Sequence, residues 1–148
     1  MSGSLKDWLK FGWLKEHKTS RQEIAGLLAV AERDLSACKT PDLHNDWRFN
    51  IACNAALQLA SAALAISGYK AERANHHYRV IESLAHTLGA DTRTIKKFDA
   101  FRKKRNISDY EQADIVSDAE ADDMRRLAEK LHIDLTTWIR KNHPDYDG

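Results

Sequence analysis

The sequence has few of the residues that shape β-rich or disulfide-bonded proteins. Its 148 residues include only two prolines, six glycines and two cysteines. So few turn-forming residues leave little room for a sandwich or barrel with many tight turns. Cys38 and Cys53 lie in alanine-rich surroundings, without a CxxC motif or a Cys/His cluster. They are expected to be small buried thiols in a reducing compartment.

The chain also lacks a strong charge of one sign and a long hydrophobic run. Its net charge is +1, which gives no overall attraction to nucleic acid or to a membrane. The most apolar stretch, residues 51–66, contains Asn54, Gln58 and Ser61 and is too short and too polar to span a bilayer. No signal-peptide pattern is visible in the first residues. We expect a cytoplasmic protein that does not associate with membranes.

What the sequence does have is helical periodicity throughout. Apolar residues recur at intervals of three and four, and no alternating strand pattern of useful length is present. The fold class expected is therefore all-α, an antiparallel up-and-down bundle of five or six helices. Residues 1–148 form one domain in this prediction, with an N-terminal amphipathic helix within residues 1–18 and a bundle core over residues 19–142. Three of the expected helices cover roughly residues 5–17, 43–67 and 72–88. Of the others, the second starts at Ser20 and is broken by Pro41, the fifth carries the arginine-rich segment, and the last starts at Ser117 and ends before Pro144.

Capping residues predict where these helices begin and end. Ser20 and Ser117 each precede a glutamate by three residues, the spacing of a capping box. Asp42 is expected to cap the third helix, and Asp91 or Thr92 the fifth. Glycines just past the third and fourth helices are typical stop signals. These glycines are Gly68 and Gly89.

The third predicted helix is rich in alanine, which favours close helix packing and a central position. The four tryptophans of the chain, taken with this helix, suggest more apolar surface than one small bundle can hide, so a homodimer is expected. Trp8 and Trp13 have two interpretations. They either face a partner or belong to a short helix that caps the domain.

The fifth predicted helix changes from apolar to cationic along its inner face. At about 100° per residue, its apolar residues share one arc with Arg102, Arg105 and Asn106. A guanidinium on the core side of a helix is costly to desolvate unless it is paired or used. Two interpretations follow and stay open. Either these residues form a ligand site, or the arginines pair with buried carboxylates and hold the bundle together.

Charged residues gather in two adjacent blocks. Residues 91–105 carry seven basic and two acidic side chains, and residues 109–123 carry seven acidic and no basic ones. The blocks either neutralise each other in a contact or form a basic site beside a solvated acidic helix start. The first interpretation is favoured for most of the lysines.

Seven histidines are present, but none sits in a metal-binding frame. A phosphate-binding glycine loop, a GxSxG elbow and a nucleophilic cysteine are also missing, so no metal and no cofactor are expected. On the fourth predicted helix His77 falls on the apolar face and His76 points outward. His77 is either a satisfied core residue or a site residue that meets Arg102 and Arg105 across the bundle.

One polar constellation remains, formed by Arg102, Arg105, Asn106, Tyr110 and His77. Arginine, asparagine and tyrosine suit contacts with phosphate and ribose. The same residue types suit metal-independent RNA cleavage, in which a base removes the 2′-OH proton and a cation stabilises the transition state.

The segment Arg-x-x-Arg-Asn-x-x-x-Tyr, Arg102 to Tyr110, resembles the terminal motif of HEPN domains (higher eukaryotes and prokaryotes nucleotide-binding). Upstream segments are similar to the central helix and the next helix of uncharacterised bacterial HEPN-like proteins. These segments are Asn50 to Ala60, Gly68-Tyr69 and His76-His77-Tyr78. The resemblance covers roughly residues 20–140. It implies a bundle of four or five helices, usually a homodimer, with the arginine-bearing helix near the dimer cleft.

HEPN domains include ribonucleases of toxin–antitoxin, abortive-infection and CRISPR systems, and partners of minimal nucleotidyltransferases. The ribonucleases carry an arginine followed, after roughly four to six residues, by a histidine. Here Arg105 and Asn106 match the motif, and Tyr110 stands where the histidine is expected. The resemblance implies binding of RNA or a nucleotide in a toxin–antitoxin or defence setting, with an antitoxin or nucleotidyltransferase as partner.

If the protein is a ribonuclease, Arg105 is expected to stabilise the phosphate, Asn106 to orient it, and His77 or Tyr110 to relay the proton. The alternative function is a non-catalytic dimeric interaction module that partners a minimal nucleotidyltransferase. In that case the arginines form structural pairs.

Overall fold

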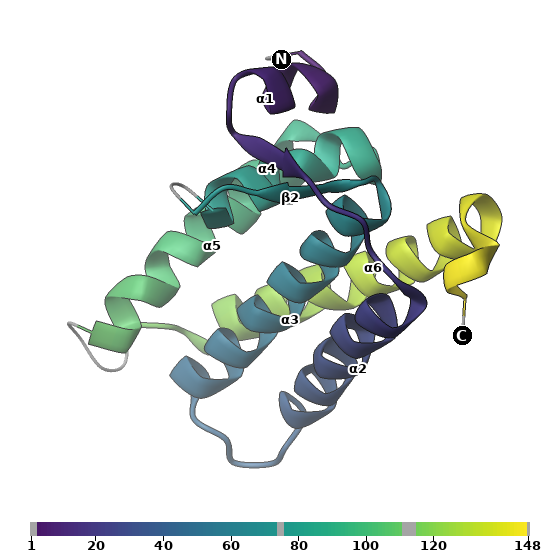
Figure 1. Cartoon of the computed structure of the whole chain (residues 1–148). Coiled ribbons are helices and arrows are strands. Elements are labelled where there is room, and N and C mark those ends of the chain that lie inside the picture. Colours follow the sequence, from purple (N-terminus) through teal and green to yellow (C-terminus); the bar gives the residue numbers. More distant parts are fainter. Residues whose placement is uncertain (1–2, 74–75, 111–114, 148) are drawn as a thin grey trace.

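A computed structural model of the protein describes residues 3–73, 76–110 and 115–147, and the side chains of residues 106–110 are outside this description. Within these residues the all-α bundle is confirmed, with six α-helices (Figure 1). The elements in order are α1 (Leu5–Lys10), β1 (Leu14–Glu16), α2 (Arg21–Ala37), α3 (Asn45–Ile66), β2 (Tyr69–Ala71), α4 (His76–Thr87), α5 (Thr92–Tyr110), α6 (Asp118–Asn142) and a 3₁₀ turn, η1 (Pro144–Tyr146).

Helix α3 is the centre of the bundle, as its alanines predict. It contacts α2, α4, α5 and α6, and α2 and α3 run in opposite directions (Figure 1). Among the described helices, α3 alone is long and apolar enough to cross a membrane by length and composition, but 72% of its most apolar window is buried in the protein. This is the burial expected of the core helix of a bundle.

Several predicted helix boundaries are correct, but the fourth helix, expected from residue 72, begins at His76 because β2 occupies Tyr69–Ala71. Ser117 and Glu120 form the reciprocal capping box of α6, and Asp91 Oδ1 accepts a hydrogen bond from Thr94 N at 2.8 Å at the start of α5. Gly68 and Gly89 have φ angles of 100° and 70°, which only glycine adopts without strain. They end α3 and α4 as expected.

The N-terminal cap predicted for α3 is wrong. Asp42 lies before the helix with a φ of 65°, and the cap is His44, whose Nδ1 accepts from Asp46 N at 3.1 Å. An imidazole nitrogen serves here as the acceptor that an aspartate usually supplies.

The single helix expected over residues 5–17 is also wrong. Helix α1 ends at Lys10, Gly12 turns the chain with a φ of 80°, and β1 pairs with β2 in an antiparallel two-stranded sheet. Each strand has three residues, so neither is long enough to show alternation. The pairing joins residues far apart in sequence, which local periodicity does not reveal.

This N-terminal segment caps the domain, the second of the two interpretations of its tryptophans. Trp8 is 3% exposed and packs edge-on against His86 and Trp13. The guanidinium of Arg79 lies 3.6 Å from the centre of the Trp13 ring. Trp47 is the exposed tryptophan, at 62%. Two of the four tryptophans proposed to cover a dimer interface are therefore used inside the protomer.

Both cysteines are buried and are not joined by a disulfide. Burial raises the pKa of the Cys38 thiol to about 11, so it stays protonated and unreactive near neutral pH. Small buried thiols were expected from the sequence.

Candidate functional site

The structure separates the two arginines that the sequence groups together. Arg102 is 16% exposed, and its Nε and Nη2 donate to Asp99 Oδ1 at 3.0 and 2.8 Å. Lys103 Nζ also lies 3.3 Å from the same carboxylate. Arg102 is therefore held by a half-buried pair on its own helix, which is the structural interpretation of this residue.

Arg105 lines a cavity together with His77, whereas Arg102, the other arginine in the second interpretation of His77, is not among the lining residues. The cavity has a volume of about 330 Å³ and lies among α2, α3, β2, α4 and the later part of α5. We call it the histidine pocket. Its polar lining residues are His17, Glu23, Asn54, Gln58, Ser61, Tyr69, Lys70, His76, His77 and Arg105. The volume falls at the lower end of the range typical of small-molecule sites.

His76 also lines this pocket, so the outward orientation predicted for it is wrong. Its ring lies 5.3 Å from that of His77. Helix α4 begins at His76, and the pocket wall includes this first turn. Periodicity within the helix does not account for the neighbours that the first turn meets.

The environment of His77 keeps its ring neutral near pH 7. Burial lowers the pKa of His77, and the positive charges of His76, Arg105 and Arg102 lower it further. A neutral imidazole offers one nitrogen as a proton acceptor. A base with a pKa below the working pH, beside a cation, is a common feature of functional sites.

Sequence reasoning missed His17, which was expected to be solvated or at a boundary. Its Nε2 lies 2.7 Å from Glu23 Oε1, and Thr19 Oγ1 donates to the same oxygen at 2.5 Å. The bonds from Thr19 and His17 lower the pKa of Glu23, so the carboxylate is ionised and Nε2 carries the proton. Because β1 brings His17 to the pocket, no local pattern signals this contact.

The same bonds correct one detail of the predicted capping box. Ser20 accepts from Glu23 N at 3.1 Å as expected, but the Glu23 side chain binds Thr19 and His17. Its carboxylate thereby becomes part of the pocket wall and is not a cap.

Asn54, another residue that lines the pocket, is fixed by a buried carboxylate. Its Nδ2 donates to Asp34 Oδ2 at 2.7 Å, and Asp34 is only 7% exposed. Because the carboxylate accepts, the amide orientation is settled, and Asn54 Oδ1 remains as an acceptor. The wall therefore offers acceptors as well as a guanidinium.

The remaining sequence-predicted residues, Asn106 and Tyr110, belong to α5, but their side chains lie outside the described part of the chain. Among the described residues, no group of three or more His, Cys, Asp or Glu side chains could hold a metal ion.

The two charge blocks meet each other, as the favoured interpretation predicts. Lys97 Nζ lies 3.1 Å from Asp123 and Lys104 Nζ lies 2.6 Å from Glu120. These ion pairs join α5 to α6. The bond from Lys104 is the main cause of the lowered pKa of Glu120.

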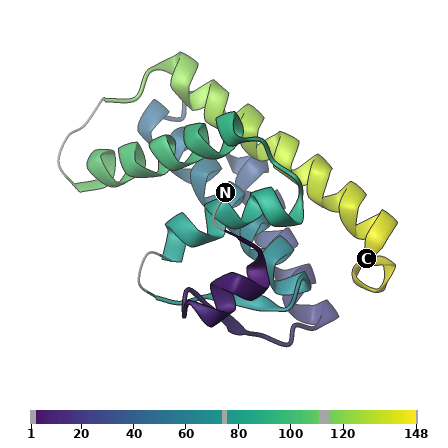
Figure 2. The same ribbon diagram turned by 90° about the horizontal axis from the view of Figure 1, so that it is seen from above.

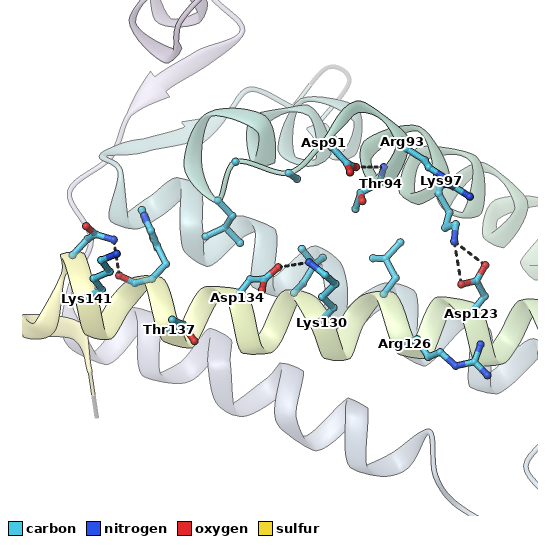
Figure 3. Close-up of a pocket in the computed structure, with 17 residues that line it drawn as sticks. Asp91, Arg93, Thr94, Lys97, Asp123, Arg126, Lys130, Asp134, Thr137 and Lys141 are labelled. Carbon is cyan, nitrogen blue, oxygen red and sulfur yellow. Dashed lines mark hydrogen bonds and ion pairs between the residues drawn. The ribbon is translucent and has the colours of Figure 1, made fainter.

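A second cavity lies between the α4–α5 turn, the first half of α5, and α6 (Figure 3). It is larger, at about 710 Å³, but contains none of the site residues predicted from the sequence. We place the candidate site in the histidine pocket because a base of lowered pKa and a guanidinium meet there.

Comparison with known proteins identifies no relative: no family model matches the sequence, and no curated protein matches it significantly.

Proposed function

We propose that this protein is a HEPN-like ribonuclease that binds RNA at the histidine pocket and cleaves it without a metal ion. The observation that carries the proposal is the placement of His77, with its lowered pKa, and Arg105 in one cavity. A neutral base and a fixed cation are the two groups that 2′-OH attack on a phosphodiester requires.

In the proposed reaction, His77 takes the proton of the ribose 2′-OH, and the 2′-oxygen attacks the adjacent phosphorus. Arg105 stabilises the negative charge on the non-bridging oxygens. The bond from phosphorus to the 5′-oxygen breaks, and this oxygen takes a proton from the imidazole of His17, which lies against Glu23. The products are a 2′,3′-cyclic phosphate and a 5′-hydroxyl.

The biological setting is proposed from the resemblance alone. Like the proteins it resembles, the chain is proposed to act in the cytoplasm as a homodimer, in a toxin–antitoxin or defence system. Its proposed partner is an antitoxin or a minimal nucleotidyltransferase.

The test is cleavage of a fluorescent RNA oligonucleotide in the presence of EDTA. Cleavage should end in a 2′,3′-cyclic phosphate and should stop when the 2′-OH at the cut site is replaced by hydrogen. His77→Gln should lower the rate by about 10²–10⁴-fold, the usual contribution of an acid–base group. The proposal is wrong if the parent protein neither cleaves RNA nor binds it at tens of micromolar.

The pairing of Arg102 with Asp99 favours a second candidate function, a non-catalytic dimeric module that binds a nucleotidyltransferase. Under this proposal Arg105 is also structural, and its replacement lowers the melting temperature without affecting any RNA cleavage. Co-purification with a minimal nucleotidyltransferase encoded beside the gene, with no RNA cleavage, would favour this function.

A further inference from the structure

The larger cavity is a groove that follows α6 for most of its length (Figure 3). Asp123 and Lys97 lie at one end of it, and Lys141 lies at the other. The stretch from Asp123 to Lys141 corresponds to about 27 Å of helix, or about five turns. We call it the α5–α6 groove. None of its lining residues belongs to the histidine pocket.

The carboxylates in this groove are all engaged. Asp91 caps α5 through Thr94 N, Asp123 pairs with Lys97 at 3.1 Å, and Asp134 pairs with Lys130 at 3.0 Å. The groove therefore contains no carboxylate that still lacks a hydrogen-bonding or ionic partner.

Its surplus charge is positive. Arg93, Arg126 and Lys141 line the groove and are exposed, and none forms an ion pair with another residue in the part of the chain that the structure describes. Asp91 keeps its negative charge because its partner is a backbone N–H. The three cations therefore leave a surplus of two positive charges, which is complementary to a partner that carries negative charge.

The floor between these charges is apolar. Leu127 and Leu131 are 8% and 3% exposed. Leu88 and Trp138, which are half-buried, also line the groove. An apolar strip bordered by charges suits an amphipathic helix, which presents apolar residues every three or four positions.

We propose that the α5–α6 groove binds an acidic amphipathic helix of a partner protein. The apolar stripe of that helix lies on Leu88, Leu127, Leu131 and Trp138, and its flanking glutamates or aspartates face Arg93, Arg126 and Lys141. A nucleic-acid strand fits less well, because its evenly spaced phosphates would meet Asp91, Asp123 and Asp134 on the walls. The proposal does not depend on ribonuclease activity.

The experiment uses a fluorescent helical peptide of five turns, with leucines at the i, i+3, i+4 and i+7 spacing and glutamates on both sides of this stripe. Anisotropy with the full-length protein should show saturable binding at tens of micromolar. A peptide of the same composition with the leucines scrambled should not bind. A peptide with lysine in place of each glutamate should bind at least about tenfold more weakly.

The protein variant is the triple substitution Arg93→Glu, Arg126→Glu and Lys141→Glu. Because these side chains are exposed and form no ion pair in the described structure, melting should be nearly unchanged, while the affinity for the acidic peptide should fall at least about tenfold. The matched control reverses three exposed lysines outside the groove, Lys6, Lys10 and Lys18. This control has the same net charge and should bind as the parent does.

Three outcomes would overturn the proposal. The first is an acidic peptide that does not bind the parent protein. The second is equal weakening in the groove variant and the control variant, which would indicate a general charge effect. The third is tighter binding of a single-stranded RNA that the groove variant loses and that displaces the peptide, which would assign the groove to nucleic acid.

Discussion

The histidine pocket and the contact between α5 and α6 arrange charged groups in opposite ways. Between α5 and α6, Lys97 and Lys104 each meet a carboxylate of the facing helix. In the pocket, burial lowers the pKa of His77, and the nearby charges of His76 and Arg105, with that of Arg102 outside the pocket, lower it further. Opposite charges stabilise each other, whereas a cluster of cations around a half-buried imidazole favours its neutral form.

This difference indicates which part of the molecule serves the fold and which serves a ligand. In the ion pairs between α5 and α6, each lysine is neutralised by a carboxylate of the same chain, so no ligand is needed to balance its charge. In the pocket, a base of lowered pKa and a guanidinium line one cavity, and an anionic ligand with a removable proton could contact both of them. The predictions that follow test this division, beginning with the largest expected effect.

Replacing Arg105 with alanine should have the largest effect. If Arg105 stabilises the phosphate, RNA cleavage should fall by about 10²–10³-fold, as for other removed transition-state donors. Stability should change little, and the pKa of His77 should move toward its ordinary value because one nearby positive charge is gone. Cleavage assays, thermal melting and NMR titration of the histidine would measure the three effects.

Arg102→Ala is the matched control for that experiment. It removes the main partner of the half-buried Asp99 and should lower the free energy of unfolding by about 1 kcal/mol, since Lys103 remains as a second partner. Cleavage should change only slightly. A large loss of stability in Arg105→Ala, together with no cleavage by the parent protein, would contradict the division and leave both arginines structural.

The second prediction concerns the support of the pocket wall. Asp34→Ala removes the buried acceptor of Asn54 Nδ2 and should lower the free energy of unfolding by about 1–3 kcal/mol. Thermal melting should show a shift of several degrees. Arg33→Ala is the control. Arg33 also binds Asp34 but is 69% exposed, so its replacement should lower the free energy of unfolding much less. Equal losses in both variants would mean that Asn54 is not held by Asp34.

Much of the fold could be predicted because its information is local. Capping residues, stop glycines and apolar spacing lie within a few positions of one another, so Ser117, Gly68 and Gly89 define their helix ends directly. The pairing of β1 with β2 is different. It joins Leu14 to Ala71, and two strands of this length carry no periodicity that a sequence pattern could show.

The candidate site was predictable only in part, for the same reason. The inward arc of α5 identified Arg105, and the apolar face of α4 identified His77. Which of the two arginines reaches the pocket depends on Asp99, whose pairing with Arg102 the arc does not reveal. His17 and Glu23 enter the site through the β1–β2 pairing and the start of α2, so their contact at 2.7 Å could not be found from spacing along one helix.

The third prediction tests the paired side of the comparison. Lys104 and Glu120 are 30% and 32% exposed. Lys104→Met should therefore lower the free energy of unfolding by less than about 1 kcal/mol at neutral pH. The lowered pKa of Glu120 means that its ion pair adds stability above the ordinary value of 4.5 and that this stability is lost as the pH falls through the lowered pKa. Urea unfolding of parent and variant should therefore differ at neutral pH and converge in acid. A constant difference would indicate lost packing of the lysine chain.

The smallest expected effect is the pH dependence that His77 gives to stability. Its pKa is lowered in the folded protein, while in the unfolded chain a histidine titrates near about 6.5. Between these two pKa values the unfolded chain binds more protons, so stability decreases as the pH falls below about 6.5. His77→Gln cannot take up this proton and should lose less stability than the parent over that interval. Melting temperatures measured at matched pH values isolate His77, because the other six histidines are common to both proteins. If the two curves stay parallel, neither burial nor the nearby cations lower the pKa of His77 in the folded protein, and the contrast between the pocket and the paired helices disappears.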